Sequence, residues 1–206
     1  MDIFDNQKPL TFNFREELDT HIISPNGFRE YDFRWLYPDE INKKGLEIFG
    51  FSLGKYISQK KGEGSSIVVG HDYRSYSSEV KYHVAKGLIT SGLNVIDIGL
   101  ALSPMVYYAQ HYLNTDSLAM ITASHNENGW TGIKCGIEKS ITFGPDEVKE
   151  IKSIVDNSHD FKAEENGNYE FKASVRDMYL EYLKSNQTTN KQETAAVPTT
   201  SCGHTN

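Results

Sequence analysis

The sequence predicts an α/β fold with a mainly parallel (mixed) sheet and helices on both faces. Three observations lead to this prediction: short aliphatic runs bounded by turn residues, segments of helical periodicity after them, and the regular alternation of the two. Such alternation favours right-handed crossovers and parallel pairing of the strands. A chain of 206 residues suffices for one domain with appendages or for two small domains.

The N-terminal segment, residues 1–27, has prolines, scattered aromatics and no sustained period, so we expect an extended arm. A helix is expected to begin at Pro38, because proline suits the first helical position and acidic residues follow it, and to end near Gly62. Its apolar positions recur at helical spacing: Leu46, Phe49, Leu53, Tyr56 and Ile57.

Strands and helices then alternate. The β-branched run at residues 65–70 predicts a buried strand, and residues 76–91 predict a helix that ends at a glycine. Residues 94–98 repeat the strand pattern, and a helix is expected over 104–113 because Ser103 and Pro104 suit a helix start. Residues 117–121 predict a third strand.

The last third of the chain is more polar. We expect a short strand at 133–135, a helix from Pro145 to about Val155, and a loop over 157–174. An apolar stripe over 175–183 predicts a linker helix. Residues 185–206 are threonine-rich with little apolar material to bury, which predicts a disordered tail.

Charge and composition exclude several classes of function. The formal net charge is −7, from 21 Lys and Arg against 28 Asp and Glu, which is the wrong sign for a nucleic-acid partner. No apolar run reaches membrane-spanning length and the N-terminus lacks a secretory pattern, so we expect no membrane partner and a cytoplasmic location. The two cysteines, Cys135 and Cys202, form neither a disulfide framework nor a structural zinc motif.

The candidate chemistry follows the strand at 117–121. In open parallel sheets, ligands bind beyond the carboxyl ends of the strands, and Thr122–Asn126 lies at such an end. A hydroxyl at Ser124 beside an imidazole at His125 suits nucleophilic or phosphoryl-transfer chemistry. The same residue types also form an ordinary turn, so the local sequence leaves both interpretations open. The phosphate-loop-like stretch Gly50–Lys55 is one residue short and lies inside a predicted helix, which argues against phosphate binding there.

Four separated segments form a more specific pattern. They are Phe28–Arg34 (FREYDFR), Gly70–Ser77 (GHDYRSYS), Ser103–Ala109 (SPMVYYA) and Thr122–Asn126 (TASHN). In order and spacing they resemble the α-D-phosphohexomutases, the family of phosphomannomutases and phosphoglucomutases. Residues 124–134 and 142–147 look especially like a bacterial phosphomannomutase branch.

The resemblance implies an enzyme, an isomerase that moves a phosphoryl group between the 1 and 6 positions of a hexose phosphate. Ser124 would carry the phosphoryl group, His125 would assist proton transfer, and Arg34 and Lys134 would supply positive charge at the substrate. Tyr31 would contact the sugar. The implied substrate is mannose or glucose phosphate. A hexose 1,6-bisphosphate would be the intermediate or activator, and Mg²⁺ would bind through phosphorylated Ser124.

The resemblance covers about residues 24–184, the first of the family's four domains and a linking helix. It implies an arm (1–27), domain I (28–157), a linker with its helix (158–184) and the disordered tail (185–206). With the later domains missing, we expect the chain alone to be inactive and the tail to belong to a truncated or frame-altered product.

Departures from the family pattern occur at three positions. His71 stands in place of the usual arginine, Glu127 in place of a common proline, and Trp35 in place of a frequent glycine.

Two other functions remain as alternatives. One is a non-catalytic sugar-phosphate binding module with Arg34, Arg74 and Lys134 as an anion site, and the other, more distant, is a serine hydrolase using Ser124 and His125.

Overall fold

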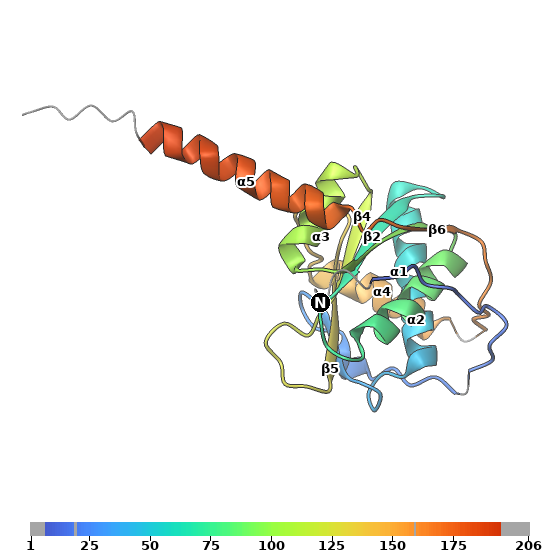
Figure 1. The fold of residues 1–206 in the computed structure, drawn as a ribbon. Helices are drawn as coiled ribbons and strands as arrows, with labels where there is room; N and C mark the ends of the chain where they lie inside the picture. The colour runs from blue at the N-terminus through green and yellow to red at the C-terminus, as the bar shows by residue number, and fades with distance from the viewer. Residues whose placement is uncertain (1–6, 19, 159, 195–206) are drawn as a thin grey trace, which may run out of the picture.

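The computed structural model describes residues 7–18, 20–158 and 160–194, and residues 187–194 by backbone alone. The described residues form a six-stranded mixed sheet of order β1-β5-β4-β2-β3-β6 with helices on both faces (Figure 1), which confirms the predicted fold class. The strands are β1 (Phe33–Leu36), β2 (Ser66–His71), β3 (Asn94–Leu100), β4 (Ser117–Ile121), β5 (Trp130–Gly136) and β6 (Asn168–Phe171). The helices are α1 (Lys43–Lys61), α2 (Ser77–Thr90), α3 (Ser103–Tyr112), α4 (Pro145–Asp156) and α5 (Val175–Thr194), with a 3₁₀ turn at Pro25–Gly27.

The sheet has a parallel centre and an antiparallel edge. Strand β2 pairs in parallel with β3 and β4, and β6 continues the parallel part beside β3. Strand β5 runs antiparallel to both β4 and β1. The aliphatic run Ile67–Val69 of β2 is buried on both faces because helices cover both sides of the sheet.

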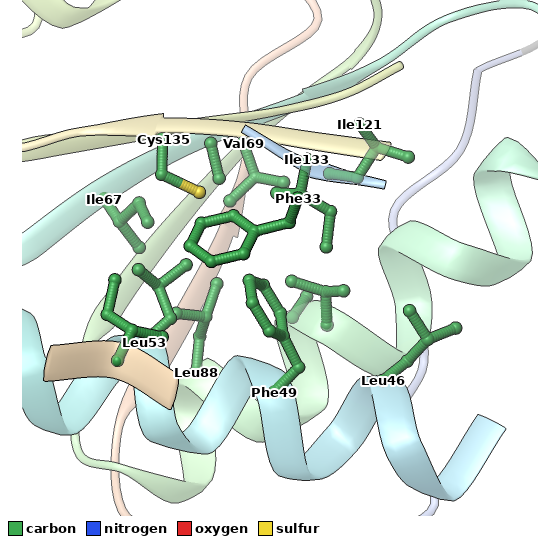
Figure 2. Close-up of a cluster of buried hydrophobic side chains, with 14 of the residues drawn as sticks. Phe33, Leu46, Phe49, Leu53, Ile67, Val69, Leu88, Ile121, Ile133 and Cys135 are labelled. Carbon is green, nitrogen blue, oxygen red and sulfur yellow. The ribbon is translucent and has the colours of Figure 1, made fainter. Parts of the chain in front are cut away.

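Two hydrophobic clusters separate the layers. Helices α1, α2 and α4 cover one face, where Phe33 and Phe49 meet at a ring-centroid distance of 4.7 Å (Figure 2). Helix α3 and the first turns of α5 cover the other face, with Val106 and Val175 in a smaller cluster. Figure 1 shows α3 and α5 on one side of the sheet, α1, α2 and α4 on the other, and α5 projecting away from the body.

Glycines let α1 and α2 approach closely. A Cβ at Gly50 would lie 2.2 Å from the carbonyl oxygen of Val84, and one at Gly87 would lie 2.1 Å from that of Glu47. At Gly54 it would lie 1.9 Å from the Ser91 hydroxyl. The glycines of the phosphate-loop-like stretch therefore serve helix packing inside α1, in agreement with the argument against phosphate binding there.

The helix expected from Pro38 begins later, at Lys43. Asn42 is the N-cap, and its side-chain oxygen accepts a hydrogen bond from the Gly45 amide at 2.9 Å. The residues between Pro38 and Asn42 form a turn in which the Glu40 amide donates to the Leu36 carbonyl at 2.8 Å. A side-chain cap thus sets the start of the helix, and the proline does not.

Two strands were not expected from the sequence. Strand β1 buries Phe33 and Trp35 on one face at the sheet edge, and only four residues carry its pattern. Strand β6 lies in the segment expected to be a loop and is only half-buried at alternate positions. Each of these strands is only four residues long, so its sequence carries a weak periodic signal.

Helix α5 extends through residues 185–194, which differs from the disordered tail expected from Ser185 onward. Adding residues to an existing helix is much easier than starting one, and the first turns of α5 are packed against α3. Residues 195–206 of the expected tail lie outside the described residues. Neither α5 nor any other helix in the described ranges combines the length and apolar character that crossing a bilayer requires.

Candidate active site

An open pocket of about 740 Å³ lies at the carboxyl ends of β2 and β4. Two loops line it, one following each strand, because parallel neighbours end at the same edge of the sheet. The lining residues are Asp72, Tyr73, Arg74, Ser75, Thr122, Ser124, His125, Asn126 and Asn128. The stretch Thr122–Asn126, which follows β4, therefore lies at this pocket, where the sequence predicts a ligand site.

Ser124 is exposed to solvent in this pocket, and its backbone is left-handed with φ of 57°. Its amide donates to the Thr122 hydroxyl at 3.0 Å. A non-glycine residue in this region carries a conformational cost, and such residues cluster at functional sites. The serine hydroxyl is thus open to a ligand, and the loop that holds it is strained.

His125 is also exposed and lines the same pocket. Its Nδ1 lies 3.5 Å from Ser124 Oγ, at the long end of hydrogen-bonding distance. No further hydrogen bond orients the imidazole among the described residues. The pair is therefore beyond the usual range of about 2.6–3.2 Å for proton transfer in this state, and it lacks the third group of a hydrolase triad.

Arg74 joins the two loops. Its Nη2 donates to the carbonyls of Asn126 at 2.6 Å and Ser124 at 3.4 Å, and its Nη1 donates to that of Glu127 at 2.8 Å. Its Nε is paired with Asp72 at 3.3 Å. The guanidinium is thus bound to the loop that carries Ser124.

Tyr76 holds the far end of the same loop. Its hydroxyl accepts from the Gly129 amide and donates to the Trp130 carbonyl, both at 2.8 Å. Ser77 donates to Asp72 at 2.5 Å, which leaves that carboxylate shared between a serine and an arginine. The segment after β2 therefore fixes the Ser124 loop at both ends.

Arg34 reaches the loop from β1. Strand alternation sends Phe33 and Trp35 into the core and Arg34 to the opposite face, where it is 9% exposed. Its guanidinium donates to the side-chain oxygen of Asn126 and pairs with Asp32. Its Nε is buried without a hydrogen-bond partner among the described residues, so this group has a spare donor.

Lys134 and Tyr31 are less directly connected to Ser124. Lys134 is half-buried on β5 and lies two positions from Gly132, the register partner of Arg34, so both cations lie on one face of the sheet. Neither it nor Tyr31 lines the pocket. Tyr31 is 60% exposed, and hydrogen bonding to Glu30 raises the pKa of its phenol. The structure thus brings Ser124 and His125 into the pocket and joins Arg34 to their loop, but Arg34, Lys134 and Tyr31 do not line the pocket.

The described residues do not form a metal site of their own. They contain no cluster of three or more histidine, cysteine or acidic side chains that could hold an ion. Asp72, the carboxylate of the pocket, is engaged by Arg74 and Ser77. Magnesium prefers about six oxygen ligands, and the part of the chain that the structure describes does not offer such a set.

Among the residues that hold the loop, only Arg74 is assigned a role from the sequence, as part of the anion site of the alternative binding module. Asp72, Arg74 and Tyr76 lie in the GHDYRSYS segment, which carried the resemblance without specifying a function for each residue. Their partners are mostly backbone groups, and every residue has such groups. The order and spacing of this segment relative to TASHN, which carry the resemblance, are the available signal.

Sequence comparison relates the chain to known proteins. The family model described as "Phosphoglucomutase/phosphomannomutase, alpha/beta/alpha domain I" matches residues 25–162. The phosphomannomutase of Vibrio cholerae is 32% identical over 159 residues, which are 77% of this chain and 34% of that protein. A Pyrococcus abyssi protein named "Probable phosphoglucosamine mutase" is 33% identical over 159 residues, 77% of this chain and 33% of its own length.

The fold has solved counterparts. The crystal structure of a phosphoglucomutase/phosphomannomutase family protein from Burkholderia thailandensis superposes with a TM-score of 0.68 at 24% identity. The match covers 78% of this chain and 35% of that structure. The chain thus spans about a third of the length of the relatives that it matches.

Proposed function

The chain belongs to the phosphoglucomutase/phosphomannomutase family, and from this membership we propose that it carries the phosphoryl-accepting serine of a phosphohexomutase at Ser124. Residues 28–157 would form domain I of that enzyme. The reaction would be an isomerisation in which a hexose phosphate, with mannose and glucose phosphates as the candidates, exchanges its phosphoryl group between the 1 and 6 positions. The expected cytoplasmic location stays a prediction.

The proposed transfer step is a simple exchange of ester bonds. The Ser124 hydroxyl oxygen attacks the phosphorus of one phosphate ester of a hexose 1,6-bisphosphate, and the bond from that phosphorus to the sugar oxygen breaks. The serine proton passes to the sugar oxygen, and His125 is the nearby group suited to relay it. In the opposite direction, phosphorylated Ser124 gives its phosphoryl group to the free 6-hydroxyl of a hexose 1-phosphate, whose proton passes to the serine oxygen, and the 1,6-bisphosphate forms. Transfer of the 1-phosphoryl group back to Ser124 then leaves the hexose 6-phosphate, which completes the isomerisation.

The observation that supports this proposal most directly is the exposed Ser124 hydroxyl in a pocket at the carboxyl ends of two parallel strands. Phosphoryl transfer depends on positioning and on charge stabilisation more than on covalent help from the protein. Arg34, with its unpartnered Nε, and Lys134 offer positive charge on the same sheet face. We assign phosphate contacts to both, and a sugar contact to Tyr31.

The rest of the proposal concerns the metal and turnover, for a chain that spans about a third of its relatives' length. Mg²⁺, if used, would bind through the oxygens of phosphorylated Ser124 and ligands from outside the described residues, because these offer no acidic cluster. We therefore assign no step to the metal. We also propose that this chain accepts a phosphoryl group but does not complete turnover by itself.

The test measures phosphorylation of Ser124 directly. The chain is incubated with glucose or mannose 1,6-bisphosphate and magnesium, and intact-mass and peptide analysis follow. We expect one phosphoryl group on Ser124, none in Ser124→Ala, and full labelling in Ser140→Ala, a matched control because Ser140 is also an exposed serine with positive φ. Absence of label in the wild-type chain would refute the proposal, and steady isomerisation by this chain would refute the claim about turnover.

A non-catalytic sugar-phosphate binding module is the second candidate. The position of Arg34 and Lys134 on one face of the sheet favours it. Of the three residues expected in its anion site, Arg74 is bound to loop carbonyls through its guanidinium. Arg34 and Lys134 are the two that remain. Binding of a hexose phosphate that is unchanged in Ser124→Ala, without any labelling of the serine, would support the module.

A further inference from the structure

The backbone of Ser124 is held from both sides. Its amide donates to the Thr122 hydroxyl at 3.0 Å, and its carbonyl accepts from Arg74 at 3.4 Å. The same guanidinium captures the carbonyls of Asn126 and Glu127, so three carbonyls of one short loop converge on one side chain. A left-handed serine persists only where its surroundings enforce that conformation, and these bonds supply the constraint.

Arg74 is itself fixed in place. Its Nε and its own amide both face Asp72, at 3.3 Å each, and Ser77 at the start of α2 binds the same carboxylate. Asp72 and Arg74 lie in the short connection between strand β2 and helix α2, so regular elements anchor the clamp on both sides. The contacts of Arg74 with the Ser124 loop therefore fix the position of Ser124 relative to the sheet.

The hydrogen bonds of Arg74 argue against a direct role in binding phosphate. A guanidinium has five N–H groups, and Arg74 uses four hydrogen bonds for Asp72 and the three carbonyls. Arg34, by contrast, keeps a buried Nε without a partner in the described residues. The two arginines near the loop thus differ, because Arg74 binds the loop through its backbone carbonyls and Arg34 binds it through the side chain of Asn126.

Resting on the proposed function, we propose that Arg74 is a positioning residue, which holds Ser124 in the geometry needed for phosphoryl transfer by clamping the loop carbonyls. The planar fork of the guanidinium is essential to this role, because a lysine ammonium is a point charge that cannot span three separated carbonyls. Positive charge alone would not be sufficient.

The experiment compares Arg74→Lys and Arg74→Ala with the wild-type full chain, and uses Arg15→Lys and Arg15→Ala as controls because Arg15 is exposed and lies outside the pocket. The first readout is hydrogen exchange of residues 122–130 in the unphosphorylated chain. The second is the rate at which glucose 1,6-bisphosphate labels Ser124, with and without millimolar guanidinium ion.

We expect both Arg74 variants to exchange faster in residues 122–130, with protection elsewhere unchanged, and to label Ser124 at least about tenfold more slowly, because a small misplacement of a reacting group costs that much or more. Guanidinium ion should restore part of the rate in Arg74→Ala and none in Arg74→Lys. A merely structural arginine would not produce this selective rescue. The Arg15 variants should match the wild-type chain.

Several results would overturn the inference. A wild-type labelling rate in Arg74→Lys would mean that positive charge alone is sufficient at this position. Unchanged hydrogen exchange of residues 122–130 in either variant would mean that Arg74 does not hold the loop. If the wild-type chain takes no label, the proposed function fails, while the exchange data still decide whether Arg74 holds the loop. Should Arg74→Ala not fold, Asp72→Asn, which weakens the clamp while conserving shape, replaces it in both measurements.

Discussion

Arg34 and Asn126 are joined side chain to side chain, from Arg34 Nη1 to Asn126 Oδ1, although 92 positions separate them in the sequence. The bond ties the edge strand β1 to the loop that carries Ser124. From the sequence, Asn126 belongs to a turn after a strand, and an asparagine is an ordinary turn residue. Its side chain instead accepts a charge-assisted hydrogen bond from a nearly buried guanidinium.

Replacing Asn126 by alanine should therefore destabilise the fold. Arg34 Nε already lacks a partner among the described residues, and Asn126→Ala would leave Nη1 without this acceptor as well. We expect a loss of about 1–3 kcal/mol in the free energy of unfolding, measured by urea denaturation. Asn128→Ala, an exposed asparagine of the same pocket, should change it by less than about 0.5 kcal/mol. Equal losses in both variants would mean that the Arg34 bond contributes nothing.

The left-handed backbone of Ser124 predicts an unusual order of stabilities. At φ of 57° a side chain carries a cost of about 1 kcal/mol that glycine avoids, so Ser124→Gly should be more stable than Ser124→Ala. Ser153, exposed within α4, is the matched control, because there alanine should exceed glycine by about 1 kcal/mol. Thermal and urea unfolding of the four variants measure both differences. The same order at the two sites would contradict the left-handed geometry.

His71 should make the fold sensitive to mild acid. It is 6% exposed at the end of β2, where burial and then the positive charge of Lys81 lower its pKa below the ordinary 6.5, against smaller opposing effects of the Asp72 carbonyl, Asp97 and the Asp72 carboxylate. Its Nδ1 donates to the Asp72 carbonyl at 2.7 Å. The unfolded chain then binds a proton more readily than the folded chain, so this contribution to stability is present above pH 6.5 and is lost as the pH falls.

The check is urea unfolding across about pH 5 to 8, the range in which a histidine titrates. The wild-type chain should lose stability toward acid with a slope of at most about 1.4 kcal/mol per pH unit from this one group. His71→Asn conserves a donor near the Asp72 carbonyl and cannot titrate, so the stability of the wild-type chain relative to this variant should decrease as the pH falls. Parallel curves would show that His71 has an ordinary pKa in the folded state.

The parts of the fold that the sequence predicts are those with a continuous burial pattern. Strand β2 is predicted because Ile67–Val69 are buried on both faces, and the place of Ser124 follows because β4 ends directly before it. Strand β6 is missed because its alternate residues are exposed and its stability comes from pairing with β3. Whether such a segment forms a strand depends on its neighbours in the sheet, which the sequence pattern does not reveal.

The same reason limits prediction of the site. Ser124 and His125 are found because their side chains carry the chemistry, and Arg34 because its flanking residues match a family motif. Arg74 binds three backbone carbonyls, and nothing in the residues at 124, 126 and 127 marks those carbonyls as its acceptors. Clamps of this kind become visible only when the loops are placed in space.

A buried ionic cluster between α1 and α2 provides the last prediction. Glu47 Oε1 lies 2.9 Å from Lys86 Nζ and 3.0 Å from His83 Nδ1, and both charged side chains are at most 1% exposed. Such a pair adds little net stability, because the cost of removing both charges from water offsets their attraction. Loss of one partner is a different matter, since the other charge then stays buried without compensation.

Glu47→Met should therefore cost about 3–5 kcal/mol of unfolding free energy, and the double variant with Lys86→Met should recover most of that loss. Recovery would stay incomplete because His83 also loses its acceptor. The exposed pair Lys152–Asp156 is the control, and Asp156→Ala should cost less than about 0.5 kcal/mol because water screens that interaction. Urea unfolding of the single and double variants gives the coupling between Glu47 and Lys86. If the double variant is as unstable as the sum of its single changes, the two charges do not compensate each other, and the close packing of α1 and α2 around Gly87 depends on some other interaction.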